Sequence, residues 1–202
     1  MPNEALIALA ALAAYLLGSV PFAVIVSRAF KLADPRTYGS KNPGATNVLR
    51  SGNKAAAALT LLGDALKGWL AVFLAQHYQL GNLGVGLVAL AVFFGHLFPV
   101  FLKFKGGKGV ATAAGVLIGL DAILGFGVIG VWVSVAFAVR YSSLAAVCAA
   151  AAAPLLTGMM LGTNGGIIVV VSILSAALIA KHWQNIQRLM TGKETRIGAS
   201  KS

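Results

Sequence analysis

Long apolar runs, separated by short polar segments, dominate the chain. Three of these runs predict membrane-spanning helices, at about 5–27, 55–77 and 83–102. Each has roughly the 20 apolar residues that a helix needs to cross the hydrocarbon core. The runs lack the strict alternation of apolar and polar residues that strands of a membrane barrel show. The pattern therefore predicts an all-α, polytopic membrane helix bundle, with residues 1–202 forming a single membrane domain.

The apolar residues after the third run are harder to divide. Residues 110–139 are long for one crossing and are interrupted by Asp121, so we expect two crossings, at 110–120 and 122–139. The first of these covers only about 16 Å. Two further crossings are expected at 144–161 and 165–181, with an outer turn at 162–166. The prediction is about seven helices, since a five-span bundle would need one overlong helix over 144–181.

Basic residues assign the helix ends to the two faces of the membrane. Lysine and arginine occur in the segments 28–54, 103–109, 140–143 and 182–202, whereas the connection at 77–84 has none. Because short loops rich in Lys and Arg stay in the cytoplasm, these four segments are expected there, with the N-terminus outside and the C-terminus cytoplasmic. The first run has no basic segment before it and no Ala-x-Ala exit, so we expect it to be retained as a span.

The composition excludes several classes of protein. With 58% hydrophobic and 10% charged residues, and a mean hydropathy of +0.86, the chain is too apolar for a soluble domain. The net charge of +11 lies at the ends of apolar runs, so we expect membrane lipids and anionic substrates as partners, and no nucleic acid. Cys148 is the single cysteine and no histidine pair has ligand spacing, so no metal site is expected. No Ser-His-Asp or Cys-His arrangement is recognisable.

Four polar segments carry candidate chemistry, and the first lies between the first two spans. Residues 38–50 combine turn-forming glycines, several hydrogen-bond donors and an arginine. This combination suits a phosphate, because arginine offers a planar pair of donors. An ordinary connecting loop is the alternative, but it would not need so many donors. The candidates are Gly39, Ser40, Asn42, Gly44, Thr46, Asn47 and Arg50.

The segment after the third span, at 101–110, contains three lysines and three glycines. Glycine lets backbone N–H groups approach an anion closely, and lysine supplies charge. The spacing and context differ from those of a soluble P-loop, which follows a strand. The lysines could instead only anchor the helix end at the interface, but this would require no glycine. The candidates here are Lys105, Gly106, Gly107 and Lys108.

Three charged or polar residues lie inside predicted spans. Asp64 and Lys67 are one turn apart, and exposing either to lipid would cost about 2.5–3.5 kcal/mol, so both should face the bundle interior. They form either a structural ion pair or a support for a bound phosphate. His96 is expected to pack against a neighbouring helix. All three are expected to support the site.

The last polar segments lie at the ends of the later spans. His182 and Asn185 are neighbours on one helical face at the cytoplasmic boundary. His182 suits acid–base chemistry or the binding of a polar substrate, and the alternative is an interfacial histidine beside Trp183. Ser142 and Ser143 begin a helix from the same side, and a helix N-cap is an equally good interpretation of them.

Taken in order, these motifs resemble those of the bacterial acyl-phosphate:glycerol-3-phosphate acyltransferase family over nearly the whole chain. The motifs are Gly18-Ser-Val-Pro21, Gly39-Ser-Lys-Asn-Pro-Gly-Ala-Thr-Asn47, Asp64-Ala-Leu-Lys-Gly68, Gly95-His-Leu-Phe-Pro-Val100, Phe104-Lys-Gly-Gly-Lys-Gly-Val-Ala-Thr112 and His182-x-x-Asn185. Any single motif would be weak, whereas the combination is highly specific.

The resemblance implies an enzyme that transfers a fatty acyl group from acyl phosphate to the 1-hydroxyl of glycerol 3-phosphate, the first step of phospholipid synthesis, without a cofactor. It implies a multi-pass protein of the bacterial inner membrane whose active site faces the cytoplasm, and we expect a monomer. By analogy, the acyl phosphate would be bound by Gly39, Ser40, Asn42, Gly44, Thr46, Asn47, Arg50, Ser142 and Ser143. Glycerol 3-phosphate would be bound by Lys105, Gly106, Gly107, Lys108, His182 and Asn185, of which Lys108, His182 and Asn185 would be catalytic.

The family often has a glutamate where this chain has Gln184, which favours a mechanism in which a substrate phosphate oxygen accepts the hydroxyl proton. An acyl phosphate already carries a good leaving group, so no covalent acyl-enzyme is expected. A membrane transporter of a phosphorylated metabolite is the main alternative, but it should have polar residues along a full path across the membrane. A lipid-binding scaffold is a third, and it would not need His182 and Asn185.

Overall fold

The computed structural model describes residues 3–162 and 165–198, which are helical apart from loops and turns. The helices are α1 (Glu4–Ser19), α2 (Phe22–Ala29), α3 (Ala45–Leu49), α4 (Lys54–His77), α5 (Gly81–Leu97), a 3₁₀ turn at Val100–Leu102, α6 (Val110–Leu120), α7 (Ala122–Val139), α8 (Ser142–Leu161), α9 (Gly165–Lys181) and α10 (Trp183–Met190). The prediction of an all-helical bundle is confirmed.

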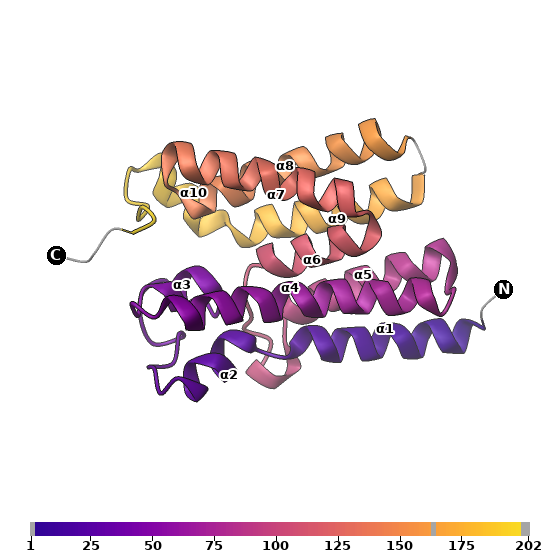
Figure 1. The fold of residues 1–202 in the computed structure, drawn as a ribbon, viewed down its shortest axis with the longest axis horizontal. Coiled ribbons are helices and arrows are strands. Elements are labelled where there is room, and N and C mark those ends of the chain that lie inside the picture. The colour runs from indigo at the N-terminus through magenta and orange to yellow at the C-terminus, as the bar shows by residue number, and fades with distance from the viewer. Residues whose placement is uncertain (1–2, 163–164, 199–202) are drawn as a thin grey trace.

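The long helices run roughly along one direction and form two groups (Figure 1). In the first group α1 packs against α5, and in the second α7 and α9 both pack against α8. The short helix α6 lies between the groups and packs against α4 and α7. Helices α3 and α10 lie at one end of the bundle, and the start of α1 lies at the other.

Small residues bring two pairs of neighbouring helices, α4 with α6 and α1 with α5, into backbone contact. A methyl group on Gly68 would overlap the backbone of Thr112, and one on Gly115 would overlap the backbone of Ala65, so α4 and α6 approach closely from both sides. Gly18 and Gly95 do the same for α1 and α5. Close packing of this kind is how helices associate in lipid, where water does not drive them together.

Within residues 3–162 and 165–198, four helical segments are long and apolar enough to cross a membrane: α4, α7, α8, and α5 together with the 3₁₀ turn. Two bent pairs raise this number to six, namely α1 with α2 (41°) and α9 with α10 (56°). The remaining predicted crossing, the fourth along the chain, is α6, which has 11 residues and is shorter than these. The chain is therefore a multi-pass membrane protein, and the count of seven spans stays a prediction.

The first predicted span is wrong in one respect, since it is two helices rather than one continuous helix over 5–27. The break falls at Val20 and Pro21, between α1 and α2. Proline has no N–H group to continue the helical hydrogen bonds, and its ring clashes with the preceding turn. Within the break, the carbonyl of Val20 accepts hydrogen bonds from Lys67 Nζ at 3.0 Å and from Phe22 N at 3.2 Å.

The residues after the third span form two helices, α6 and α7, with the bounds that the sequence predicts. Asp121 ends α6 and caps α7, because its Oδ1 accepts a hydrogen bond from Leu124 N at 2.8 Å. The interpretation of Ser142 and Ser143 as a helix N-cap is wrong, because Tyr141 holds that position. The outer turn predicted at 162–166 includes Thr163 and Asn164, which lie outside the described residues.

Candidate functional site

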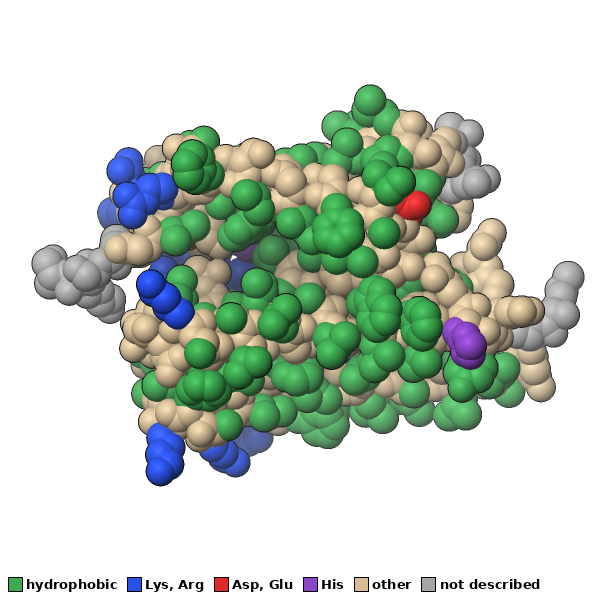
Figure 2. All heavy atoms as spheres, viewed as in Figure 1, with side chains coloured by type: hydrophobic (Ala, Val, Ile, Leu, Met, Phe, Trp, Pro, Cys, Tyr) green, Lys and Arg blue, Asp and Glu red, His purple; other side chains and the backbone are tan. Residues whose placement is uncertain are grey.

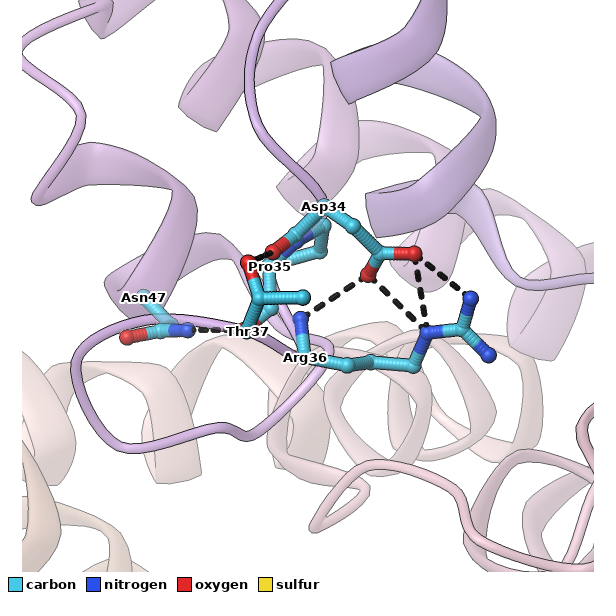
Figure 3. Close-up of polar contacts among 5 residues, drawn as sticks. All are labelled: Asp34, Pro35, Arg36, Thr37 and Asn47. Atoms are coloured by element: carbon cyan, nitrogen blue, oxygen red, sulfur yellow. Dashed lines mark hydrogen bonds and ion pairs between the residues drawn. The ribbon is translucent and has the colours of Figure 1, made fainter.

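The loop between α2 and α3 is held in place by Asn47. This buried side chain accepts a hydrogen bond from Ser40 N at 3.0 Å and donates to the carbonyls of Pro35 (2.6 Å) and Tyr38 (3.2 Å). Figure 3 shows the amide of Asn47 directed at this turn, beside the pair formed by Asp34 and Arg36. Asn47 therefore shapes the predicted phosphate-binding loop, and its hydrogen bonds are already used within the loop.

Gly39 lets Arg50 lie close to this loop. Its φ of +58° is in the left-handed region, which glycine adopts without strain. A side chain at this position would overlap Asn47 and meet the stem of Arg50 at 3.1 Å. Arg50 is exposed at the end of α3, so its guanidinium is free to reach an anion. Ser40 and Thr46 are also exposed, whereas Asn42 and Gly44 are half-buried.

The three lysines of the glycine-rich segment differ in their surroundings. Lys103 and Lys105 are exposed, whereas the half-buried Lys108 donates to Asn185 Oδ1 at 2.5 Å. The N–H of the buried Gly107 donates to the carbonyl of His96 at 3.1 Å. The glycines thus pack the segment against the end of α5, and only the last lysine points into the bundle.

A carboxylate that the sequence analysis did not select organises the inner end of the site. Glu194 Oε1 accepts hydrogen bonds from Ser143 Oγ and Asn185 Nδ2, both at 2.7 Å, and Oε2 accepts one from Arg188 Nε, also at 2.7 Å. Glu194 is the only acidic residue in the basic tail at 182–202. That isolation is the sequence signal that would have identified it.

The C-terminal tail is fixed over the start of α8. Ile197 N donates to the carbonyl of Arg140 at 2.6 Å, and Arg140 Nη2 donates back to the carbonyl of Ile197 at 3.0 Å. The guanidinium of Arg196 lies 5.5 Å from the ring centre of Tyr141. These contacts carry Glu194 to Ser143 and Asn185.

A second contact joins the two groups of helices at this end. The hydroxyl oxygens of Thr46 and Ser142 lie 3.2 Å apart, which links the start of α3 to the start of α8. Together with the Lys108–Asn185 and Ser143–Glu194 contacts, this brings α3, the glycine-rich segment, the start of α8 and the segment after α9 together at one end of the bundle. Figure 2 shows Lys and Arg side chains gathered at the same end, with hydrophobic side chains over the rest of that face.

The cluster carries an excess of positive charge. Burial lowers the pKa of Lys108 to about 8, and repulsion from Arg188, Arg50 and Lys181 adds to this, while Glu194 opposes it. Burial raises the pKa of Glu194, but the hydrogen bonds from Ser143, Asn185 and Arg188 outweigh that effect, so its net pKa is lowered. Lys108 therefore has three further cations and one carboxylate close enough to affect its charge, and this excess of positive charge favours an anionic ligand.

His182 lies just beyond α9 and is neutral. Burial lowers its pKa to about 4, and the charge of Lys108 adds to this, while the bond to Leu178 O opposes it. Its Nδ1 is 2.8 Å from the carbonyl of Leu178. In the neutral ring Nδ1 therefore carries the proton, and Nε2 is left as an acceptor.

The three polar residues inside the spans form a separate cluster deeper in the bundle. Lys67 Nζ lies 2.8 Å from Asp64 Oδ1, and His96 Nδ1 lies 3.4 Å from the same oxygen. The predicted contact of His96 with a neighbouring helix is therefore confirmed. The cluster also borders the glycine-rich segment, since Gly107 packs against the His96 ring.

Comparison with known proteins identifies the family. A family model described as glycerol-3-phosphate acyltransferase matches residues 8–192. The chain belongs to the glycerol-3-phosphate acyltransferase family. It is therefore an acyltransferase, and the transporter alternative does not fit this family.

Curated relatives named glycerol-3-phosphate acyltransferase cover nearly the whole chain. A protein from Dechloromonas aromatica is 69% identical over 195 residues, which cover 96% of this chain and 98% of the relative. One from Paraburkholderia phymatum is 59% identical over 95% of this chain and 92% of the relative. The family predicted from the motifs is confirmed.

Solved structures of PlsY, an integral membrane glycerol 3-phosphate acyltransferase, have the same fold. Its glycerol 3-phosphate form superimposes with a TM-score of 0.89 at 35% identity, over 95% of this chain and 96% of that chain. Its lysophosphatidic acid form gives a TM-score of 0.87 at 35% identity, over 95% of both chains.

Proposed function

We propose that this acyltransferase moves a fatty acyl group from acyl phosphate to the 1-hydroxyl of glycerol 3-phosphate. The products are lysophosphatidic acid and inorganic phosphate. The observation that carries the proposal is the cluster of Lys108, Arg50 and Arg188 with a single carboxylate beside His182 and Asn185. Two phosphates must be held close together for this reaction, and the excess of cations offsets their mutual repulsion.

The two substrates are assigned to the two sides of the cluster. The acyl phosphate lies against Gly39, Ser40 and Arg50, near the Thr46–Ser142 contact that links the helix groups. The phosphate of glycerol 3-phosphate is bound by Lys108, while His182 and Asn185 orient its hydroxyl groups. Lys105 remains in this set as an exposed lysine at the rim. Asn47, Gly106 and Gly107 contribute by shaping the two loops.

The reaction is a direct transfer. The 1-hydroxyl oxygen attacks the acyl carbonyl carbon, a new ester C–O bond forms, and the C–O bond to the phosphate breaks. His182 Nε2 accepts a hydrogen bond from the attacking hydroxyl and orients it. Because its pKa is about 4, His182 is a weak base at neutral pH, so the proton passes to an oxygen of the departing phosphate. No acyl-enzyme forms.

The site lies at the cytoplasmic face of the bacterial inner membrane, in a monomer. The gathering of Lys and Arg at one end of the bundle supports this orientation, because basic loops stay in the cytoplasm. The acyl chain then remains in the lipid, and only the reacting ends enter the polar cluster.

A donor comparison tests the proposal. The detergent-purified protein is incubated with glycerol 3-phosphate and, in turn, with acyl phosphate, acyl-CoA or acyl carrier protein. We expect lysophosphatidic acid and an equal amount of inorganic phosphate with acyl phosphate alone. Transfer from acyl-CoA without transfer from acyl phosphate would disprove the proposed donor.

A further inference from the structure

Three charged or titratable side chains are buried in the helices, outside the cluster assigned to the substrates. The side chains of Asp64, Lys67 and His96 are 4%, 1% and 9% exposed. Placing such groups at membrane depth is costly, at about 2.5–3.5 kcal/mol for each charge, unless they are paired. Asp64 Oδ1 lies within 3.4 Å of both Lys67 Nζ and His96 Nδ1, so the buried charges of Asp64 and Lys67 are paired within the cluster. The role of the cluster is therefore to be sought in the residues that it contacts.

His96 touches the glycine-rich segment in two ways. Its carbonyl accepts the N–H of Gly107 at 3.1 Å. Its ring lies against the same glycine, because a methyl group on Gly107 would overlap Nε2 of the imidazole. The opposite edge of the ring, at Nδ1, faces Asp64. Gly107 immediately precedes Lys108, whose side chain reaches Asn185.

The cluster also contacts the break in the first predicted span. Lys67 Nζ donates to the carbonyl of Val20, which lies in the break between α1 and α2. A narrow pocket joins these parts, and its lining includes Val20, Lys67, His96, Gly107 and Pro43 of the loop before α3. The buried cluster therefore lies beneath both loops to which the substrates are assigned.

We propose that His96 is a positioning residue for Lys108. Asp64 fixes the orientation of the imidazole ring, and the ring and carbonyl of His96 hold Gly107 so that Lys108 points towards Asn185. The inference rests on the proposed function, in which Lys108 binds the phosphate of glycerol 3-phosphate. His96 itself does not touch that substrate.

Reciprocal substitution tests this proposal. The φ of Gly107 is not positive, so the main obstacle to alanine there is the His96 ring. We expect His96→Ala and Gly107→Ala each to lower kcat/KM for glycerol 3-phosphate about tenfold, mainly through KM, with KM for acyl phosphate changed less than about twofold. In the double variant the new methyl group fills space that the ring has left. The kcat/KM of the double variant should therefore be about tenfold higher than the value expected if the two substitutions acted independently.

Gly106→Ala is the matched control. A methyl group there would overlap the backbone carbonyl of His96 and approach Pro99, and neither contact depends on the imidazole. His96→Ala should therefore not rescue Gly106→Ala. Rescue of both glycine variants alike would contradict a specific role for the ring.

The outcomes separate this inference from the proposed function. Multiplicative effects of His96→Ala and Gly107→Ala, or an equal rise in KM for both substrates, would overturn the positioning role while the transfer activity stands. Absence of acyl transfer by the unmodified protein would overturn the proposed function. The contact between His96 and Gly107 could then still be tested, from the midpoints of thermal unfolding of the unmodified protein, the two single variants and the double variant. If His96→Ala does not fold, His96→Asn keeps a donor towards Asp64 and lacks the ring edge that meets Gly107.

Discussion

The two charged clusters of this protein contain the same kinds of side chain but differ in net charge and burial. At the end of the bundle, Lys108 is close to the cations Arg188, Arg50 and Lys181 and to one carboxylate, Glu194, and Arg50 is exposed. Within the helices, Lys67 and His96 share Asp64, and all three are buried. The first cluster has more cations than anions and is open to a ligand. The second is closed and compensated.

The difference shows how to distinguish a binding cluster from a supporting one. A buried ion pair leaves little net charge to attract a substrate, and removing one of its partners mainly lowers the stability of the fold. A cluster that has excess positive charge and reaches the surface attracts an anion, and removing one of its cations mainly lowers activity. Each prediction below changes one cluster and asks which of these two properties responds.

Lys67→Met should have the largest effect, on stability. The substitution leaves Asp64 charged and buried with only His96 beside it, which should cost about 3–5 kcal/mol of folding free energy. The measurement is the midpoint of thermal unfolding of the detergent-purified protein. Asp64→Asn with Lys67→Met removes both charges and should restore most of the loss. An unchanged midpoint in the single variant would show that the buried pair is not structural.

Lys108→Ala and His182→Ala should mainly affect catalysis. Each removes a group that is preorganised around the reacting atoms, so kcat should fall at least about a hundredfold. The unfolding midpoint should stay close to that of the unmodified protein. Lys103→Gln, which removes an exposed lysine of the same segment, is the control and should be nearly fully active. Full activity of either purified alanine variant would remove that residue from the site.

Arg50→Lys should have an intermediate effect. The charge remains, but the planar pair of donors to a phosphate is lost, so KM for acyl phosphate should rise about tenfold. Arg36→Gln in the same loop provides the comparison, because Arg36 already pairs with Asp34. Steady-state kinetics with each substrate varied distinguishes the two. A larger effect of Arg36→Gln would place the donor phosphate on the other side of the loop.

The pH dependence should show the smallest change. The pKa of Lys108 is about 8, so the lysine is charged below this value and loses its charge above it. Since kcat/KM reports the free enzyme, its value for glycerol 3-phosphate should fall to about half its plateau at pH 8. His182 and Glu194 stay neutral and ionised, respectively, through this range. Lys108→Arg should abolish the alkaline decline, and a decline that persists in that variant would assign it to another group.

Much of the fold follows from the order of apolar runs and breakers. The bounds of α7 and α9 agree with the predicted spans at 122–139 and 165–181, because Asp121 and the polar residues beyond Lys181 end the apolar runs sharply. The break at Pro21 was missed, because the apolar pattern continues through it. The contact of Lys67 Nζ with the Val20 carbonyl, which joins α4 to this break, is visible only in the structure.

The site was predicted less completely than the fold. The motifs selected Lys108, His182 and Asn185, of which Lys108 and Asn185 are in direct contact. They did not separate residues that shape a loop from residues that face a ligand, as Asn47 and Gly107 show. Glu194 was missed because its position depends on the course of the C-terminal tail back to Ser143. The sequence marks Glu194 only as the lone carboxylate of a basic tail, and it does not show which distant residues that carboxylate contacts.

The most direct test of the account is an initial-rate experiment in which the concentrations of both substrates are varied. It asks whether the acyl group passes straight from one bound substrate to the other at a site that holds two phosphates. If acyl phosphate and glycerol 3-phosphate are bound together beside Lys108 and Arg50, reciprocal plots of rate against one substrate at several concentrations of the other should intersect. Parallel lines would indicate that phosphate leaves before glycerol 3-phosphate reacts, as in a covalent acyl-enzyme mechanism. That result would contradict the proposed site.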